Sequence, residues 1–425
     1  MNPAATEFSE HHYVPEWYQR RFLVPGQSKY WYLDLQPEEV NNARVRYRRR
    51  SLLNWGPDLC FKQKDLYTVN WRGSKNTDIE RYFFGKVDTF GQRAVQFFTD
   101  FAYEKITDDL YHNLLTYLSV QKLRTPKGLE YLQRMAATDR QSTILYLLQK
   151  IQNLYCSIWT EAIWQIADAS NSKTKFIVSD HPVTVYNRGC YPQSIFCKDG
   201  NDPDIRLVAS HTYFPLSLDK LLVFTNLSWL RDPYQKETNV RPNPDLFRPA
   251  IAHFLDIQTE RKLDEVEVLE VNYITKKRCR RYIAAAEREW LFPEDKLSCK
   301  HWRKLGNGYL FMPEPRHTFM GGEVYIGYED GTSEAFGAYG HRPWQRGFKD
   351  RNREQRESAT LDRFKAEWAA MIGPEFRGWT PRFGSNELRI ADSPESHERY
   401  LEEDKRYRGL PGERRRRRSL LRSTN

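Results

Sequence analysis

Residues 175–186, Lys-Phe-Ile-Val-Ser-Asp-His-Pro-Val-Thr-Val-Tyr, decide the fold class of this chain. Two short runs rich in β-branched and aromatic residues stand on either side of a polar, proline-containing turn, and this pattern is typical of strands. Similar short runs follow at residues 205–209 and 221–225. The pattern therefore predicts a small mixed or antiparallel sheet in the middle of the chain.

Helical patterns surround this sheet. Apolar residues recur at helical spacing over residues 77–101, and again from Thr107 to the residue before Pro126. A longer helix with one break is predicted over residues 128–169, and a further helix over residues 263–290. The sequence thus predicts an α+β fold in which a helical N-terminal half packs against the sheet.

The segment before these helices combines strand patterns with basic residues. Residues 29–35 and 44–50 predict a hairpin-like pair of strands. Alternate arginines of the second strand would share one face, where they suit a phosphate backbone. A second basic group lies on the predicted helix 263–290, and a solvated surface is the alternative for both groups. The candidate nucleic-acid contacts are Arg46, Arg48, Arg50, Lys277 and Arg281.

Charge and composition divide the 425 residues unevenly. Aromatic residues make up 14% of the chain, which argues against global disorder. The net charge is +10, and residues 341–425 alone hold 21 Lys and Arg against 14 Asp and Glu. We predict an α+β domain over residues 1–292, a small appended region over 293–372, and a basic, largely disordered tail over 373–425. Arg414–Arg418 in this tail would suit a polyanion.

Several features bear on the cellular compartment. No apolar run approaches the roughly 20 residues that span a bilayer, and the first residues do not resemble a signal peptide. The six cysteines are scattered without a CxxC pair, which indicates ordinary thiols. The expected location is therefore the cytoplasm, with no membrane partner. The protein partner and the oligomeric state stay open.

Motifs of several enzyme classes are absent. The chain has no Walker loop, no GxGxxG after a strand, no HExxH and no GxSxG. Phosphate-binding loops of NTPases, Rossmann dinucleotide sites, zincins and α/β-hydrolases are therefore not indicated.

Polar residues of a candidate site come from separate stretches of the chain. Histidine transfers protons near pH 7, a carboxylate orients a histidine or holds a divalent metal, and arginine binds phosphate in a planar fork. The candidate catalytic residues are His11, His12, Glu80 and Asp180, and the candidate phosphate-binding residues are Gln121, Arg124 and Ser179. Mg²⁺ or Mn²⁺ is the candidate cofactor, with Glu80 and Asp180 as its candidate ligands. His12 is favoured as the proton carrier.

Each of these residues also has a structural interpretation. Thr77 and Glu80 have the spacing of a capping box at a helix start. Arg124 suits the carbonyls at a helix end, and residues 179–182 suit a turn before a strand. Gln121 stands on an otherwise apolar helix face, so it needs a buried partner or a cavity.

Three stretches, in this order, resemble a widespread microbial family of unknown function whose members open with an HHYVP-like motif. They are His11-His12-Tyr13-Val14-Pro15, Gln121 to Pro126, and Phe176 to Pro182. The resemblance covers roughly residues 9–292. It implies the extent of a domain but carries no activity.

Three functions remain open at this point. The first is a nuclease or phosphodiesterase acting on nucleic acid, as a toxin or defence effector. The second is a non-catalytic module that binds protein or nucleic acid, in which the histidines are structural. The third is a hydrolase of a small phosphorylated metabolite, which requires a closed pocket instead of an open groove.

Overall fold

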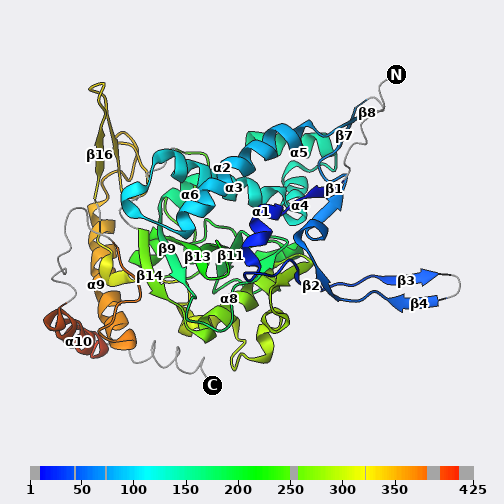
Figure 1. Ribbon diagram of the computed structural model, residues 1–425. Coiled ribbons are helices and arrows are strands. Elements are labelled where there is room, and N and C mark those ends of the chain that lie inside the picture. The colour runs from blue at the N-terminus through cyan, green and yellow to red at the C-terminus, as the bar shows by residue number, and fades with distance from the viewer. Residues whose placement is uncertain are drawn as a thin grey trace.

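The computed structural model describes residues 10–42, 45–71, 74–248, 257–320, 322–380 and 393–410. Helices and several small sheets alternate along this part of the chain, so the predicted α+β class is confirmed (Figure 1).

A mixed five-stranded sheet forms the centre of the molecule. In sheet order its strands are β11 (Thr184–Asn187), β12 (Ser210–Pro215), β13 (Lys220–Asn226), β9 (Ala162–Asp168) and β14 (Ile257–Lys262). β14 runs parallel to β9, and the other neighbours are antiparallel. Every residue of β9 is buried. Helices therefore cover both faces of this sheet.

The helices predicted before the sheet lie on one of its faces (Figure 1). They are α2 (Gly85–Thr99), α3 (Asp108–Arg124), α4 (Pro126–Ala136), α5 (Gln141–Lys150) and α6 (Cys156–Thr160). Trp164 of β9 stacks on Tyr111 of α3, with ring centroids 4.8 Å apart. Thr107 caps α3, because its side chain accepts a hydrogen bond from the Leu110 amide. The helix α8 (Glu265–Arg278) lies on the opposite face (Figure 1).

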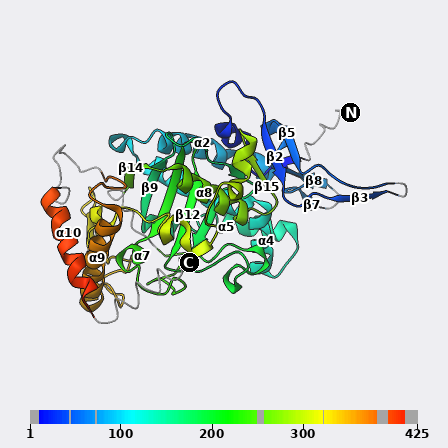
Figure 2. The same cartoon turned by 90° about the horizontal axis from the view of Figure 1, so that it is seen from below.

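A second sheet joins distant parts of the chain. Its four antiparallel strands are β10 (Val178–Ser179), β15 (Tyr282–Ala285), β2 (Tyr30–Asp34) and β5 (Leu52–Trp55). The predicted pairing of residues 29–35 with 44–50 is wrong, since β2 pairs with β15 and β5. Short helix α1 (Glu16–Gln19) precedes this sheet. Seen from below, the second sheet lies beside the central one (Figure 2).

Four two-stranded sheets complete the strand pairing of the described residues. The pairs are β1 (Glu10–His12) with β6 (Lys62–Lys64), β3 (Glu39–Asn42) with β4 (Val45–Arg48), β7 (Val69–Trp71) with β8 (Ser74–Asn76), and β16 (Val324–Gly327) with β17 (Ser333–Phe336).

The C-terminal elements stand at one edge of the molecule. The long helix α9 (Arg351–Ile372) packs against α7 (Leu227–Arg231) and α10 (Pro394–Arg408) (Figure 2). The helix α10 was not predicted from the sequence. Arg414–Arg418 lies outside the described residues, as does 381–392.

Two predicted helices end earlier than expected. The helix predicted over 128–169 is divided into α4, α5 and α6, and its last part is β9. The helix predicted over 263–290 ends at Arg278 and is followed by β15. Both strands are almost fully buried, and a continuous apolar run does not separate strand from helix.

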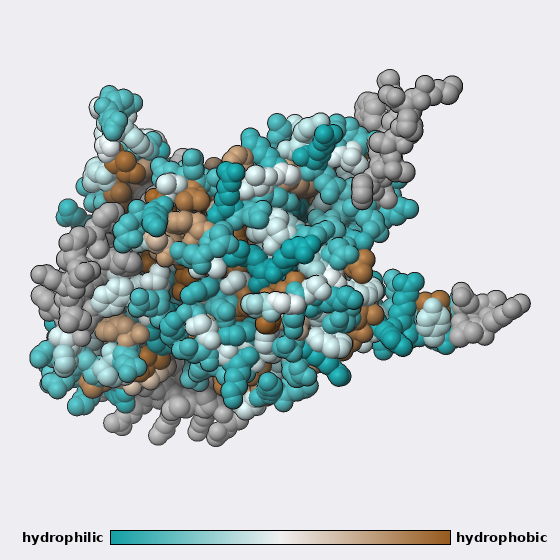
Figure 3. Space-filling model, viewed as in Figure 1, coloured by the Kyte–Doolittle hydropathy of each residue, from teal (hydrophilic) through white to brown (hydrophobic). Residues whose placement is uncertain are grey.

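Most of the face seen in Figure 3 is hydrophilic, with apolar side chains in small groups. No helix in the described ranges is apolar over a stretch long enough to cross a membrane. All six cysteines lie in these ranges and are free thiols.

Candidate functional site

A pocket of about 220 Å³ lies between the helices α3 and α4 and residues 196–206. Aromatic and aliphatic side chains form much of its wall, whereas charged side chains form its floor. The apolar part is made by Leu123, Tyr131, Tyr155, Phe196, Ile205 and Leu246. This combination of an apolar wall and a few converging polar groups is typical of small-molecule sites.

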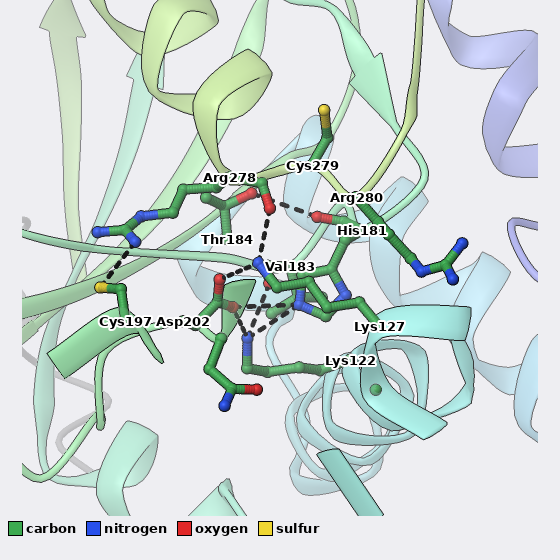
Figure 4. Close-up of polar contacts among 12 residues, drawn as sticks. Lys122, Lys127, His181, Val183, Thr184, Cys197, Asp202, Arg278, Cys279 and Arg280 are labelled. Atoms are coloured by element: carbon green, nitrogen blue, oxygen red, sulfur yellow. Dashed lines mark hydrogen bonds and ion pairs between the residues drawn. The ribbon is translucent and has the colours of Figure 1, made fainter. Parts of the chain in front are cut away.

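The floor is a buried group that we call the Asp202 cluster: Lys122, Lys127, His181 and Asp202 (Figure 4). Lys122 donates hydrogen bonds to the Asp202 carboxylate and, at 3.2 Å, to the Val183 carbonyl. Lys127 donates to Asp202 Oδ1 at 2.6 Å. The side chains of the four cluster members are at most 8% exposed. Charges buried to this degree are normally paired, as they are here.

The junction of α3 and α4 brings the two lysines together. Thr125 has an extended backbone that ends α3, and its hydroxyl accepts a hydrogen bond from the Gly128 amide at 3.2 Å. Proline follows at the first position of α4, where its missing N–H costs nothing. A Cβ on Gly128 would stand 2.3 Å from the Lys122 carbonyl oxygen. Glycine therefore allows the close junction that places Lys122 and Lys127 on one pocket floor.

His181 is held in the cluster by both ring nitrogens. Nδ1 lies 2.7 Å from the Thr125 hydroxyl, and Nε2 lies 3.1 Å from Asp202 Oδ2. Burial, and after it the charge of Lys122, lowers the pKa of His181 from 6.5 to about 3. The imidazole is therefore neutral at physiological pH and adds no charge to the floor.

The cluster carries an excess of positive charge. Burial alone would raise the pKa of Asp202, but Lys122, Lys127 and His181 hold this pKa well below its ordinary value. Burial lowers the pKa of Lys122 more than Asp202 raises it. In formal charges, one carboxylate pairs with two lysine side chains, so the cluster has an excess of one positive charge when both lysines are protonated. A small anion in the pocket would balance this charge.

The burial of His181 predicts how the stability of the protein changes at acidic pH. An unfolded His181 takes up a proton below its ordinary pKa of 6.5, whereas the folded ring does so only near 3. The free energy of unfolding should therefore fall on acidification between these values, with up to about 1.4 kcal/mol per pH unit from this residue. We expect His181→Asn to have a shallower pH dependence in urea denaturation than wild type.

The matched control for this measurement is His112→Asn, because His112 is exposed on α3. His211 is buried with a pKa of about 3 and contributes to the slope in all three proteins. Equal slopes for wild type and His181→Asn would contradict the burial of a neutral His181.

The first histidine of the opening motif lies in a different polar group. His11 is 1% exposed and stacks on the ring of Tyr67 at 5.4 Å. Its Nδ1 accepts a hydrogen bond from the Tyr67 amide at 3.0 Å, and its Nε2 lies 2.8 Å from Glu80 Oε2. Glu80 therefore contacts a histidine. The helical turn that begins at Ile79 has no side-chain cap hydrogen bond, so the predicted capping box is not formed. The His11 Nε2–Glu80 contact is close but does not have hydrogen-bond geometry.

Gln121 and Arg124 continue the same group from α3. Gln121 donates to the Tyr13 carbonyl at 2.9 Å and accepts from Arg124 Nε at 2.7 Å. Gln121, a polar residue on an otherwise apolar helix face, thus has the buried partners that such a position requires. Arg124 also forms two hydrogen bonds to Asp88, at 3.0 and 2.7 Å, and its carbonyl accepts from the Tyr67 hydroxyl. We call this set the His11 network.

Asp180 and Ser179 accept hydrogen bonds from backbone amides outside the His11 network. Asp180 accepts hydrogen bonds from three successive backbone amides, those of residues 280–282, at 2.6 to 2.9 Å. The Ser179 hydroxyl accepts from the His181 amide at 3.2 Å. Asp180 thereby joins the end of β10 to the start of β15, which is a structural role.

The favoured proton carrier, His12, is only partly buried. Its Nε2 lies 3.8 Å from Glu16, and 24% of its side chain is exposed. Within the described residues no group of three or more His, Cys, Asp or Glu side chains is placed to hold a metal. Binding of Mg²⁺ or Mn²⁺ by Glu80 and Asp180 therefore stays a prediction without a formed metal site.

Lys277 and Arg281, the two candidate nucleic-acid contacts on the predicted helix 263–290, have different surroundings. Arg281 pairs with both carboxylate oxygens of Asp34, at 2.9 and 2.7 Å. Lys277 is exposed and lies over the Tyr273 ring at 5.5 Å. Arg281 thus has a partner within the protein, whereas Lys277 faces solvent.

The residues of the Asp202 cluster were not singled out from the sequence. Lys122 and His181 do lie inside two of the stretches that carry the family resemblance, next to Gln121 and Asp180. The residues selected from the sequence are therefore the chain neighbours of two cluster members. Gln121 and Asp180 themselves bond to other parts of the protein. Asp202 lies in a loop rich in Asn, Asp and Gly, where no pattern separates a buried carboxylate from a turn residue.

Comparisons with known proteins complete the description of the site. Residues 10–153 and 148–289 match the sequence model of a family described as "Protein of unknown function (DUF4238)". The matches span more than half of the chain and include Lys122, Lys127, His181 and Asp202. Neither the curated proteins nor the solved structures contain a match.

Proposed function

Because the chain belongs to the DUF4238 family, whose description assigns no activity, we propose a function from the pocket itself: the protein binds a small phosphorylated metabolite on the Asp202 cluster. The observation that carries this proposal is the unbalanced positive charge buried at the floor of a pocket. This is the closed-pocket alternative considered from the sequence, without a commitment to hydrolysis.

The donors on the floor suit a phosphate group. Lys127 uses two of its three N–H groups on Asp202 Oδ1 and the Arg278 carbonyl, each at 2.6 Å, which leaves one for a ligand. At the rim, Arg206 is 46% exposed and pairs with Asp204. A guanidinium and an ammonium group are the side chains that proteins use most often for phosphate.

Size and wall chemistry limit the organic part of the ligand. A volume of about 220 Å³ is below the range of pockets for drug-sized molecules, so the ligand is small. Tyr131, Tyr155 and Leu246 offer flat apolar surface on which a planar or aliphatic group can pack. Sugar phosphates and nucleoside monophosphates have this combination of charge and size.

Binding should depend on Lys127 and Arg206. We expect calorimetric titration of the purified protein with nucleoside monophosphates, sugar phosphates, inorganic phosphate and small dicarboxylates to give saturable binding for at least one phosphate compound. Lys127→Gln should weaken this binding at least about tenfold, because one charge-assisted hydrogen bond contributes roughly 1.5–3 kcal/mol. Arg206→Gln should weaken it without loss of stability, since Arg206 is at the surface.

Lys86→Gln is the matched control, because Lys86 is exposed on α2 away from the lining residues. Equal ligand affinity of wild type, Lys127→Gln and Arg206→Gln would exclude this pocket as the binding site. Binding of dicarboxylates alone would assign the same floor to a carboxylate ligand instead of a phosphate. Release of inorganic phosphate during the titration would show that the protein also hydrolyses the phosphorylated ligand.

Phosphodiester cleavage of nucleic acid, as by a toxin or defence effector, is the second candidate. It is favoured by the contact of His11 with Glu80, whose side chain is 36% exposed and so reaches solvent. The test is cleavage of labelled RNA, single-stranded DNA and duplex DNA, with and without Mg²⁺ or Mn²⁺. We expect Glu80→Gln to abolish any such cleavage, and cleavage unchanged in Glu80→Gln would exclude this pair.

A further inference from the structure

A two-stranded ribbon made by β3 and β4 projects from the body of the protein (Figures 1 and 2). Its strands pair in antiparallel register, with Glu39 opposite Arg48 and Asn41 opposite Arg46. We call residues 38–42 and 45–50 the basic arm. The ribbon begins just after β2 of the second sheet, where Arg281 contacts Asp34 and Glu38. A salt bridge therefore holds the base of the arm against the body.

The arm carries more positive charge than its own carboxylates balance. Its described residues include four arginines against two glutamates. Arg46 pairs with Glu39 at 2.9 Å and Arg49 with Glu38 at 3.2 Å, and both pairs lie within the arm. Arg48 and Arg50 are exposed and form no ion pair with a described residue. Arg48 and Arg50 are thus charged donors available to a partner.

We propose that the basic arm binds the phosphate backbone of duplex DNA. Two paired strands lie about 5 Å apart, and with their side chains they match a DNA major groove about 12 Å wide. Arginine neutralises nucleic-acid phosphates and binds them with a planar fork of donors. This interaction is independent of the pocket, which is made by other elements.

The shape and surface of the arm favour duplex DNA over other polyanions. The major groove of duplex RNA is deep and narrow, so a ribbon does not enter it. A membrane surface would require apolar side chains that insert between lipids. The described surface of the arm is mostly hydrophilic (Figure 3), and Tyr47 is its one exposed large hydrophobic residue among those described.

The test compares the affinity of the full chain for a labelled DNA duplex at several salt concentrations by fluorescence anisotropy. Arg414–Arg418 are replaced by glutamine in every protein, so that this second basic run adds no background. On this background, Arg48→Gln with Arg50→Gln should weaken binding about tenfold or more. It should also reduce the slope of log K against log salt by about one unit for each phosphate that the arm no longer neutralises.

The control is Arg346→Gln with Arg356→Gln, two exposed arginines outside the arm. It should bind as the background protein does. The substituted arm residues are exposed, so an unchanged thermal transition shows that both variants fold. The proposal is overturned if the background protein does not bind duplex DNA, or if the arm and control variants bind it equally. It is also overturned if the arm substitutions reduce binding only to duplex RNA or to vesicles containing phosphatidylserine.

Discussion

Asp202→Ala should lower the free energy of unfolding by about 3–5 kcal/mol, the cost of leaving a buried charge without its partner. The substitution removes the carboxylate that pairs with both Lys122 and Lys127, whose side chains are at most 8% exposed. The two ammonium groups would then repel each other in a site with little water. Urea denaturation at pH 7 of purified wild type and variant measures this loss.

The loss should depend on pH in a defined direction. Without Asp202 the folded lysines hold their protons less tightly than the unfolded chain does, where the lysine pKa is about 10.4. The unfolded state then binds more protons, so the stability of the variant rises with pH and its deficit shrinks toward pH 10. Asp204→Asn is the control, because Asp204 is 40% exposed and its pair with Arg206 should contribute no more than about 1 kcal/mol. A deficit that is the same at pH 7 and pH 10 would contradict the charge argument.

Local patterns predicted much of the fold, because the elements concerned have one buried side. The apolar spacing of residues 77–101 corresponds to α2 and the turn before it, and Thr107 is the cap of α3 as its sequence indicates. Strand β9 was missed because both of its faces are buried, so it shows no alternation. The pairing of β2 with β15 joins residues about 250 positions apart, and no local pattern encodes such a contact.

The site was less accessible to sequence reasoning than the fold. The sequence context of Gln121 requires a buried partner or a cavity, and its partners are the Tyr13 carbonyl and Arg124. A buried polar residue indicates a network, however, and does not tell whether that network faces a cavity. Lys122 and Asp202 meet across 80 residues of chain, and each alone has the appearance of a surface charge. Their pairing becomes visible only when α3 and residues 196–206 are placed together.

Arg124→Leu should lower the free energy of unfolding by about 3 kcal/mol, because Arg124 is the centre of the His11 network. Its guanidinium is 1% exposed and donates to both oxygens of Asp88 and to Gln121. Leucine keeps most of the buried volume but leaves Gln121 Oε1 without its donor and Asp88 without its partner. Loss of one member of a buried hydrogen-bonded ion pair costs about 3–5 kcal/mol. We take the lower end because Asp88 is 25% exposed and is partly solvated.

His12→Ala provides the contrast that separates a structural network from a catalytic one. His12 is 24% exposed and its nearest charged partner, Glu16, is 3.8 Å away, so its removal should cost no more than about 1 kcal/mol. If the His11 network maintains the fold, the order of stability in urea is wild type, His12→Ala and then Arg124→Leu. An Arg124→Leu protein as stable as wild type would show that Arg124 is held for another purpose. Phosphate binding by Arg124, as expected from the sequence, would then again be the leading interpretation of this arginine.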